Sequence, residues 1–113
     1  MPRSLILIRN CSGILTRIEC EIRPLEGGRG LWTLLCAAGM SDAQPSAIKA
    51  QGPFHGPCVA EGLLEAVAQS LKLQGYEQCN EPPIWRLHLQ AELRKLNGER
   101  CQHLGDFQFR LDP

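Results

Sequence analysis

Cys58 and His55 are the two residues best suited to chemistry, because they lie close together in a segment rich in proline and glycine. A helix is expected to begin near Cys58, and the unpaired N–H groups at the start of a helix favour the thiolate form of cysteine. A histidine beside such a thiolate can act as the base for a nucleophile. The alternative is that Cys58 is a first-turn helix residue that faces the core and that His55 is solvated, since no third residue that would orient His55 can be named.

A second candidate is a binding or acid–base cluster of His88, Asp106 and Arg86 on the polar face of a predicted hairpin. If a three-residue loop joins the two strands, His88 falls directly opposite Asp106. A carboxylate in this position can orient an imidazole as a general base. The alternative is a surface cross-strand pair, which contributes only about 0.2–1 kcal/mol to stability.

Metal binding is not expected, although two short motifs carry ligand-type residues, His55-x-x-Cys58 and Cys101-x-His103. Structural zinc sites normally use Cys-x-x-Cys or a similar knuckle, and the sequence has none. The segment at 27–30 lacks the Lys-Ser/Thr ending of a phosphate-binding loop and precedes a strand, so it predicts a hairpin loop. No cofactor is therefore expected.

The composition indicates one small folded domain spanning residues 1–113. Hydrophobic residues make up 43% of the chain, which is enough for a core. Lysine plus arginine equal aspartate plus glutamate at 12 each, whereas nucleic-acid binders usually have a basic excess. Nucleic acid is therefore not an expected partner, and the zero net charge removes a barrier to self-association.

The chain is expected to be soluble and cytoplasmic. The apolar run Leu5–Ile8 is too short for a signal-peptide core and far too short to span a membrane. Six cysteines in a short chain would suggest disulfides only in a secreted protein, so reduced thiols are expected here. Cys20 and Cys36 lie inside apolar strand patterns, where a thiol acts as a small hydrophobe.

The first part of the chain has the patterns of β-strands. Residues 5–9 predict a short strand that is apolar on both faces. Residues 14–22 alternate between apolar and polar side chains, which indicates a strand with one face on a core and the other in water. Residues 31–38 are apolar on both sides, so this strand is expected to be central or covered on its outer face.

A helix is predicted to follow this sheet. Residues 47–51 are compatible with a fourth short strand, whereas the prolines and glycines at 52–57 are expected to exclude regular structure. Apolar residues then recur at helical spacing from about Cys58 to Gln74. This segment predicts one long amphipathic helix.

The end of the chain predicts a second hairpin. Residues 85–93 and 107–111 alternate between apolar and polar side chains around an Asn97-Gly98 turn signal. A three-residue loop, Leu96-Asn97-Gly98, keeps the apolar residues of both strands on one face, and a bulge near 104–105 is the alternative.

The predicted fold class is α+β, with an antiparallel sheet of about five to six strands and one long amphipathic helix packed on one face. The predicted order is strand, strand, strand, possible strand, helix, strand, strand. One helix covers only one face of such a sheet. The remaining apolar surface therefore needs a loop, a ligand or a second copy of the chain as its cover.

Because no convincing catalytic set emerges, we expect a non-enzymatic binding or interaction domain that self-associates as a homo-oligomer. One alternative is a small thiol-dependent enzyme or redox-sensitive protein that uses Cys58 with His55. Another alternative is a carrier of a small apolar ligand, whose identity the sequence does not define.

Overall fold

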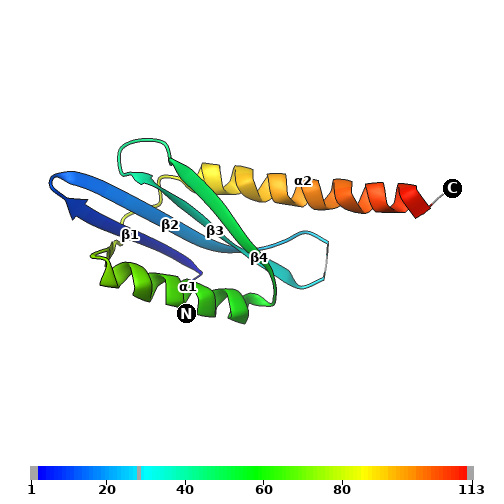
Figure 1. Ribbon diagram of the computed structural model, residues 1–113, viewed down its shortest axis with the longest axis horizontal. Helices are drawn as coiled ribbons and strands as arrows, with labels where there is room; N and C mark the ends of the chain where they lie inside the picture. Colours follow the sequence, from blue (N-terminus) through cyan, green and yellow to red (C-terminus); the bar gives the residue numbers. More distant parts are fainter. Residues whose placement is uncertain (1–2, 28, 112–113) are drawn as a thin grey trace.

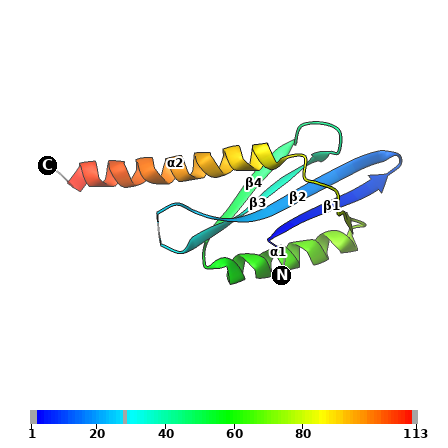
Figure 2. The ribbon, with the colours of Figure 1, turned by 180° about the vertical axis from the view of Figure 1, so that it is seen from behind.

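The computed structural model describes residues 3–27 and 29–111, with side chains described as far as residue 98. It contains a five-stranded antiparallel sheet in the order β4-β3-β2-β1-β5 and two helices, which confirms the α+β class (Figure 1). The two helices lie on opposite faces of the sheet, as both views show (Figures 1 and 2). The elements are β1 (Ser4–Cys11), β2 (Ile14–Pro24), β3 (Leu31–Met40), β4 (Ala47–His55), α1 (Pro57–Leu73), β5 (Glu77–Gln78) and α2 (Arg86–Leu111).

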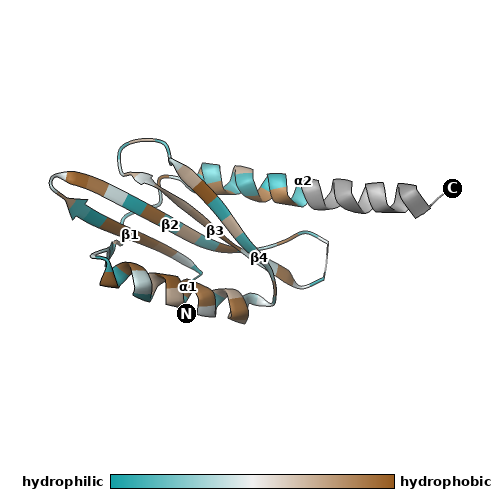
Figure 3. Cartoon of the chain, viewed as in Figure 1, coloured by the Kyte–Doolittle hydropathy of each residue, from teal (hydrophilic) through white to brown (hydrophobic). Residues whose placement is uncertain are grey.

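The first core lies between α1 and the sheet, and its residues follow from the strand alternation. Cys20 and Ile22 of β2 face α1, as do Leu5 and Leu7 of β1. Figure 3 shows the apolar residues along α1 and along the strands that it faces. Each large aliphatic side chain buried here contributes about 1.5–3 kcal/mol to stability. The predicted long helix on one face of the sheet is therefore confirmed.

The predicted final hairpin is wrong, because residues 86–111 form the single helix α2. Trp85, Leu89 and Leu93 fit helical spacing as well as strand alternation, and the first two are buried against the sheet. Leu87, which alternation placed on the apolar face, is 75% exposed. The helical segment also contains no valine, isoleucine or threonine, the residues whose branching at Cβ favours strands.

The second core lies between α2 and the other face of the sheet. Trp85 and Leu89 pack on Leu35 of β3, which is apolar on both faces. Farther along α2, the side-chain oxygen of Asn97 accepts the backbone N–H of Glu26 at 3.0 Å and ties the β2–β3 loop to the helix. A second helix therefore covers the other apolar face of the sheet. The sequence had predicted a loop, a ligand or a second copy of the chain as this cover.

The possible fourth strand is confirmed as β4, but it extends to His55 through the segment that was expected to be irregular. The pairing of β4 with β3 shifts register between Trp32 and Leu34. This local irregularity accommodates Gly52 and Pro53 within β4. Proline is tolerated here because β4 is an edge strand, with no partner on its outer side in the described chain.

Two glycine-to-alanine substitutions are expected to change stability in opposite directions. A Cβ at Gly39 would stand 2.9 Å from the backbone nitrogen of Ser46, so the turn after β3 must shift and Gly39→Ala destabilises by about 1–3 kcal/mol. At Gly62 of α1 nothing lies within 4 Å of such a Cβ, so Gly62→Ala stabilises by about 0.5–1 kcal/mol. Urea denaturation measures both effects. Equal effects of the two substitutions would contradict the close approach at Gly39.

Candidate functional site

The face of β2 that lies away from α1 carries four charged side chains in a row, those of Arg17, Glu19, Glu21 and Arg23. The first three are polar positions of the predicted alternation, and they were expected to face water. The chain between β5 and α2 instead crosses this face, and Arg17 and Glu19 are each only 2% exposed. The middle of β2 is therefore buried on both sides.

Arg17 and Glu19 form a buried ion pair that holds the start of α2. Nε of Arg17 donates to Oε2 of Glu19 at 2.7 Å. The backbone N–H groups of Ile84 and Trp85 donate to Oε2 and Oε1 of Glu19, at 2.8 and 3.1 Å. Nη2 of Arg17 donates to the carbonyl of Pro82 at 3.0 Å. Both members of the pair thus bind the segment that leads into α2.

Glu19 acts as a helix cap supplied by a distant strand. Trp85 precedes the first residue of α2, and its carbonyl accepts the N–H of Leu89 at 3.0 Å, as the residue before a helix does. The carboxylate of Glu19 accepts the N–H of Trp85, the role that a glutamate inside the helix has in a capping box. Its negative charge also complements the positive end of the helix dipole. This arrangement favours anchoring of α2 over catalysis.

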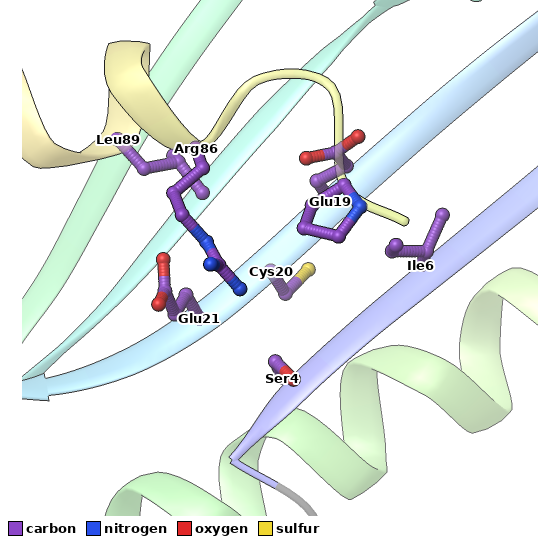
Figure 4. A pocket seen from close by; sticks show the side chains of 8 residues that line it. Ser4, Ile6, Glu19, Cys20, Glu21, Arg86 and Leu89 are labelled. Carbon is purple, nitrogen blue, oxygen red and sulfur yellow. The ribbon is translucent and has the colours of Figure 1, made fainter. Parts of the chain in front are cut away.

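A cavity of about 70 Å³ opens beside the ion pair (Figure 4). The side chain of Arg86 reaches from α2 toward Glu21, so part of the cavity wall is charged. Ligand pockets usually occupy about 300–1,000 Å³, so this cavity suits a few water molecules or one small group. The lining residues are Ser4, Ile6, Glu19, Cys20, Glu21, Pro83, Arg86 and Leu89.

An exposed apolar surface lies at the end of the sheet where β1 turns into β2. Ile14, Leu15 and Met40, which we call the sheet-end patch, are 52%, 43% and 51% exposed. They line a hollow of about 260 Å³ together with neighbouring turn residues. The N–H of Ser41 donates to the carbonyl of Leu15 at 3.0 Å, which holds the end of β3 beside the hairpin. Ile14 and Met40 lie on the α1 face of the sheet and Leu15 on the other face, so this end of the sheet exposes apolar side chains on both faces. Exposed apolar surface of this kind marks interaction sites.

Cys58 and His55, the predicted nucleophile and base, lie on either side of the step from β4 to α1. Cys58 is the second residue of α1, so its predicted place at the start of a helix is confirmed. Both side chains are exposed, and neither makes a hydrogen bond within the described part of the chain. The structure therefore adds no orienting residue to this pair.

The predicted cluster of His88, Asp106 and Arg86 is not formed, because it depended on two paired strands. His88 and Asp106 both belong to α2, and at 1.5 Å per residue they lie about 27 Å apart along its axis. The side chain of Asp106 lies outside the described residues. His88 is half-buried, and its Nδ1 has no hydrogen-bond partner among the described atoms. Arg86 lines a cavity, beside Glu21.

The metal motifs gain no support where the side chains are described. Within residues 3–27 and 29–98, no group of three or more potential metal ligands comes together. The side chains of Cys101 and His103 lie outside this range. Neither of the two described helices combines the length and the apolar composition that a membrane crossing requires.

Sequence reasoning missed the Arg17–Glu19 pair and the sheet-end patch. Alternation looks the same whether the polar face of a strand meets water or another part of the chain, so the burial of the pair had no local signal. The patch did have a signal. Ile14 and Leu15 are consecutive in a strand, so their side chains point to opposite faces and both cannot enter one core.

Comparison with known proteins identifies a family. No curated protein and no solved structure gives a significant match to this chain. A protein-family model, described as PA4575-like protein, matches residues 1–113. Because this match covers the full length of the sequence, the chain belongs to the family of PA4575-like proteins.

Proposed function

We propose that the protein is a non-enzymatic interaction module that associates with a second copy of itself through the sheet-end patch. The observation that carries this proposal is the exposure of Ile14, Leu15 and Met40 around one hollow. Burial of such side chains between two copies removes apolar surface from water. The chain has a formal net charge of zero, so two copies do not repel each other strongly.

The alternatives have weaker support in the geometry. A carrier of a small apolar ligand needs a pocket, but the cavity beside Arg86 holds about 70 Å³ and the one between Leu96 and Pro53 about 150 Å³. Both cavities, and the hollow of about 260 Å³ beside the sheet-end patch, are smaller than ordinary ligand pockets of about 300 Å³ or more. A thiol-dependent enzyme or redox-sensitive protein that uses Cys58 with His55 needs an orienting group, and no described residue supplies one.

We also infer that the protein works in the cytoplasm, where thiols stay reduced. The support is that Cys11 and Cys58 are exposed thiols with no disulfide partner among the described residues, which a reducing compartment protects from oxidation.

Sedimentation equilibrium tests the proposed self-association. We expect a reversible dimer in the micromolar range, and at least about tenfold weaker association for Leu15→Glu and Met40→Glu, because each would bury a carboxylate among apolar side chains. Val59→Glu is the matched control, since Val59 is 55% exposed and lies at the start of α1, near the opposite end of the sheet (Figure 1). A monomeric wild type at 100-fold higher concentration, or equal association of all variants, would contradict the proposal.

A further inference from the structure

Cys20 of β2 and Cys36 of β3 face each other directly across the sheet. They are partners in the antiparallel register, and both side chains belong to the core under α1. No other two described cysteines are partners in the register, since Cys11 lies opposite Ile14. Whether two facing cysteines can react with each other depends on the kind of cross-strand pair that they form.

The hydrogen bonds at the two ends of the β2–β3 ribbon identify this kind of pair. The N–H of Leu25 donates to the carbonyl of Leu31 at 2.8 Å, and the N–H of Ser41 donates to the carbonyl of Leu15 at 3.0 Å. Hydrogen-bonded and non-hydrogen-bonded pairs alternate along an antiparallel ladder. The odd-numbered residues of β2 therefore form the hydrogen-bonded pairs, and Cys20 belongs to a non-hydrogen-bonded pair.

Non-hydrogen-bonded pairs bring side chains closest together. Their Cα atoms lie about 4.5 Å apart, and a disulfide requires a Cα–Cα separation of about 4.4–6.8 Å. Cys20 and Cys36 can therefore be joined while β2 and β3 keep their register. The separation lies inside the permitted range, so the bond can form without movement of the backbone.

The two thiols differ in a way that assigns them separate roles. Cys20 is 2% exposed, whereas Cys36 is half-buried and more accessible. Hydrogen bonding from the Cys20 thiol lowers the pKa of Cys36, and the same contact, together with burial, raises the pKa of Cys20. A reachable thiol with thiolate character is the attacking partner in disulfide exchange. Cys36 fits that role, and Cys20 fits the role of the second thiol.

We propose that Cys20 and Cys36 form a reversible disulfide site that small-molecule disulfides oxidise. The thiolate of Cys36 attacks one sulfur of the small disulfide, whose S–S bond breaks and releases one thiolate that takes up a proton. Cys20 then loses its proton and attacks the sulfur of Cys36, which displaces the second small thiol. Two protein thiols are oxidised and one small disulfide is reduced to two thiols. This site is independent of the sheet-end patch and of the proposed self-association.

Incubation of the full chain with oxidised glutathione tests the site. The remaining thiols are alkylated after unfolding, and the peptides are analysed by mass spectrometry. We expect a peptide cross-linked between Cys20 and Cys36, the loss of both thiols from the alkylated pool, and their full return on addition of dithiothreitol. If glutathione becomes attached to the exposed Cys11 and Cys58 while Cys20 and Cys36 stay fully alkylatable, the proposal is overturned.

Single substitutions separate the two roles. Cys20→Ala is expected to trap one glutathione on Cys36, whereas Cys36→Ala is expected to leave Cys20 unmodified. Cys58→Ser is the matched control and keeps the cross-link, because Cys58 is exposed and remote from the pair in the register. Circular dichroism checks that each variant folds, and if an alanine variant does not, the wild type and Cys58→Ser decide the question. Trapping of glutathione on Cys20 in place of Cys36 would overturn the assigned roles.

Discussion

Glu19→Ala is expected to lower the free energy of unfolding by about 3–5 kcal/mol, a large share of the stability of a small domain. The substitution leaves Arg17, which is 2% exposed, without its buried counter-charge. It also removes the acceptor of two backbone N–H groups, those of Ile84 and Trp85. Guanidinium denaturation followed by circular dichroism measures the loss, and a fall in Tm of about 10 °C or more should accompany it.

Two further variants show whether the ion pair itself causes this effect. Glu65→Ala removes an exposed carboxylate from α1 and is expected to change stability by less than about 0.5 kcal/mol. The double substitution Arg17→Met with Glu19→Met is expected to recover part of the loss, because apolar side chains leave no unpaired buried charge. A loss below about 1 kcal/mol for Glu19→Ala would show that the pair does not anchor α2.

Trp85→Ala is expected to destabilise the protein by about 3–5 kcal/mol, the range for removal of a large buried aromatic side chain. Trp85 is 2% exposed and packs with Leu89 on β3, so its loss opens a cavity under the start of α2. Its Nε1 also donates to the carbonyl of Ala43 at 2.9 Å, which ties α2 to the turn between β3 and β4. Denaturation can be followed by the fluorescence of Trp32, which remains in the variant.

Trp85→Phe separates packing from the hydrogen bond. Phenylalanine keeps most of the apolar contact but cannot donate to Ala43, so we expect a smaller loss of about 1–2 kcal/mol. If the alanine and phenylalanine variants were equally destabilised, the hydrogen bond and not the packing would dominate at this position. If neither lost stability, α2 would not be packed on the sheet as described.

Most of the fold could be predicted from the sequence as far as residue 74; the exception is residues 52–55, where prolines and glycines were expected to exclude the strand that β4 forms. The alternation at 14–22 and the helical stripe of α1 each fit a single element, and both are confirmed. The end of the chain was ambiguous. Trp85, Leu89 and Leu93 satisfy both the strand and the helix period, and an Asn-Gly step inside a helix resembles a turn. Residue composition was the better guide there, since helix formers dominate.

The candidate site was harder to predict, because its contacts join distant parts of the chain. Glu19 caps a helix that begins 67 residues later, and no local pattern marks a carboxylate for that role. Arg86 was predicted to lie beside Asp106, which is far away along α2. Arg86 nevertheless lines a cavity, next to Glu21. The Cys20–Cys36 pair needed the register of β2 and β3, which the sequence left undefined.

Backbone hydrogen exchange at Ile84 and Trp85 tests most directly whether Glu19 fixes α2 to the second face of the sheet. Both amides precede α2, where no helical hydrogen bond protects them, so protection must come from the carboxylate. We predict slow exchange at both in the wild type, and exchange at least about tenfold faster in Glu19→Gln, which weakens a charge-assisted bond. Exchange in the wild type at the rate of an unstructured peptide, or no change in the variant, would contradict this account.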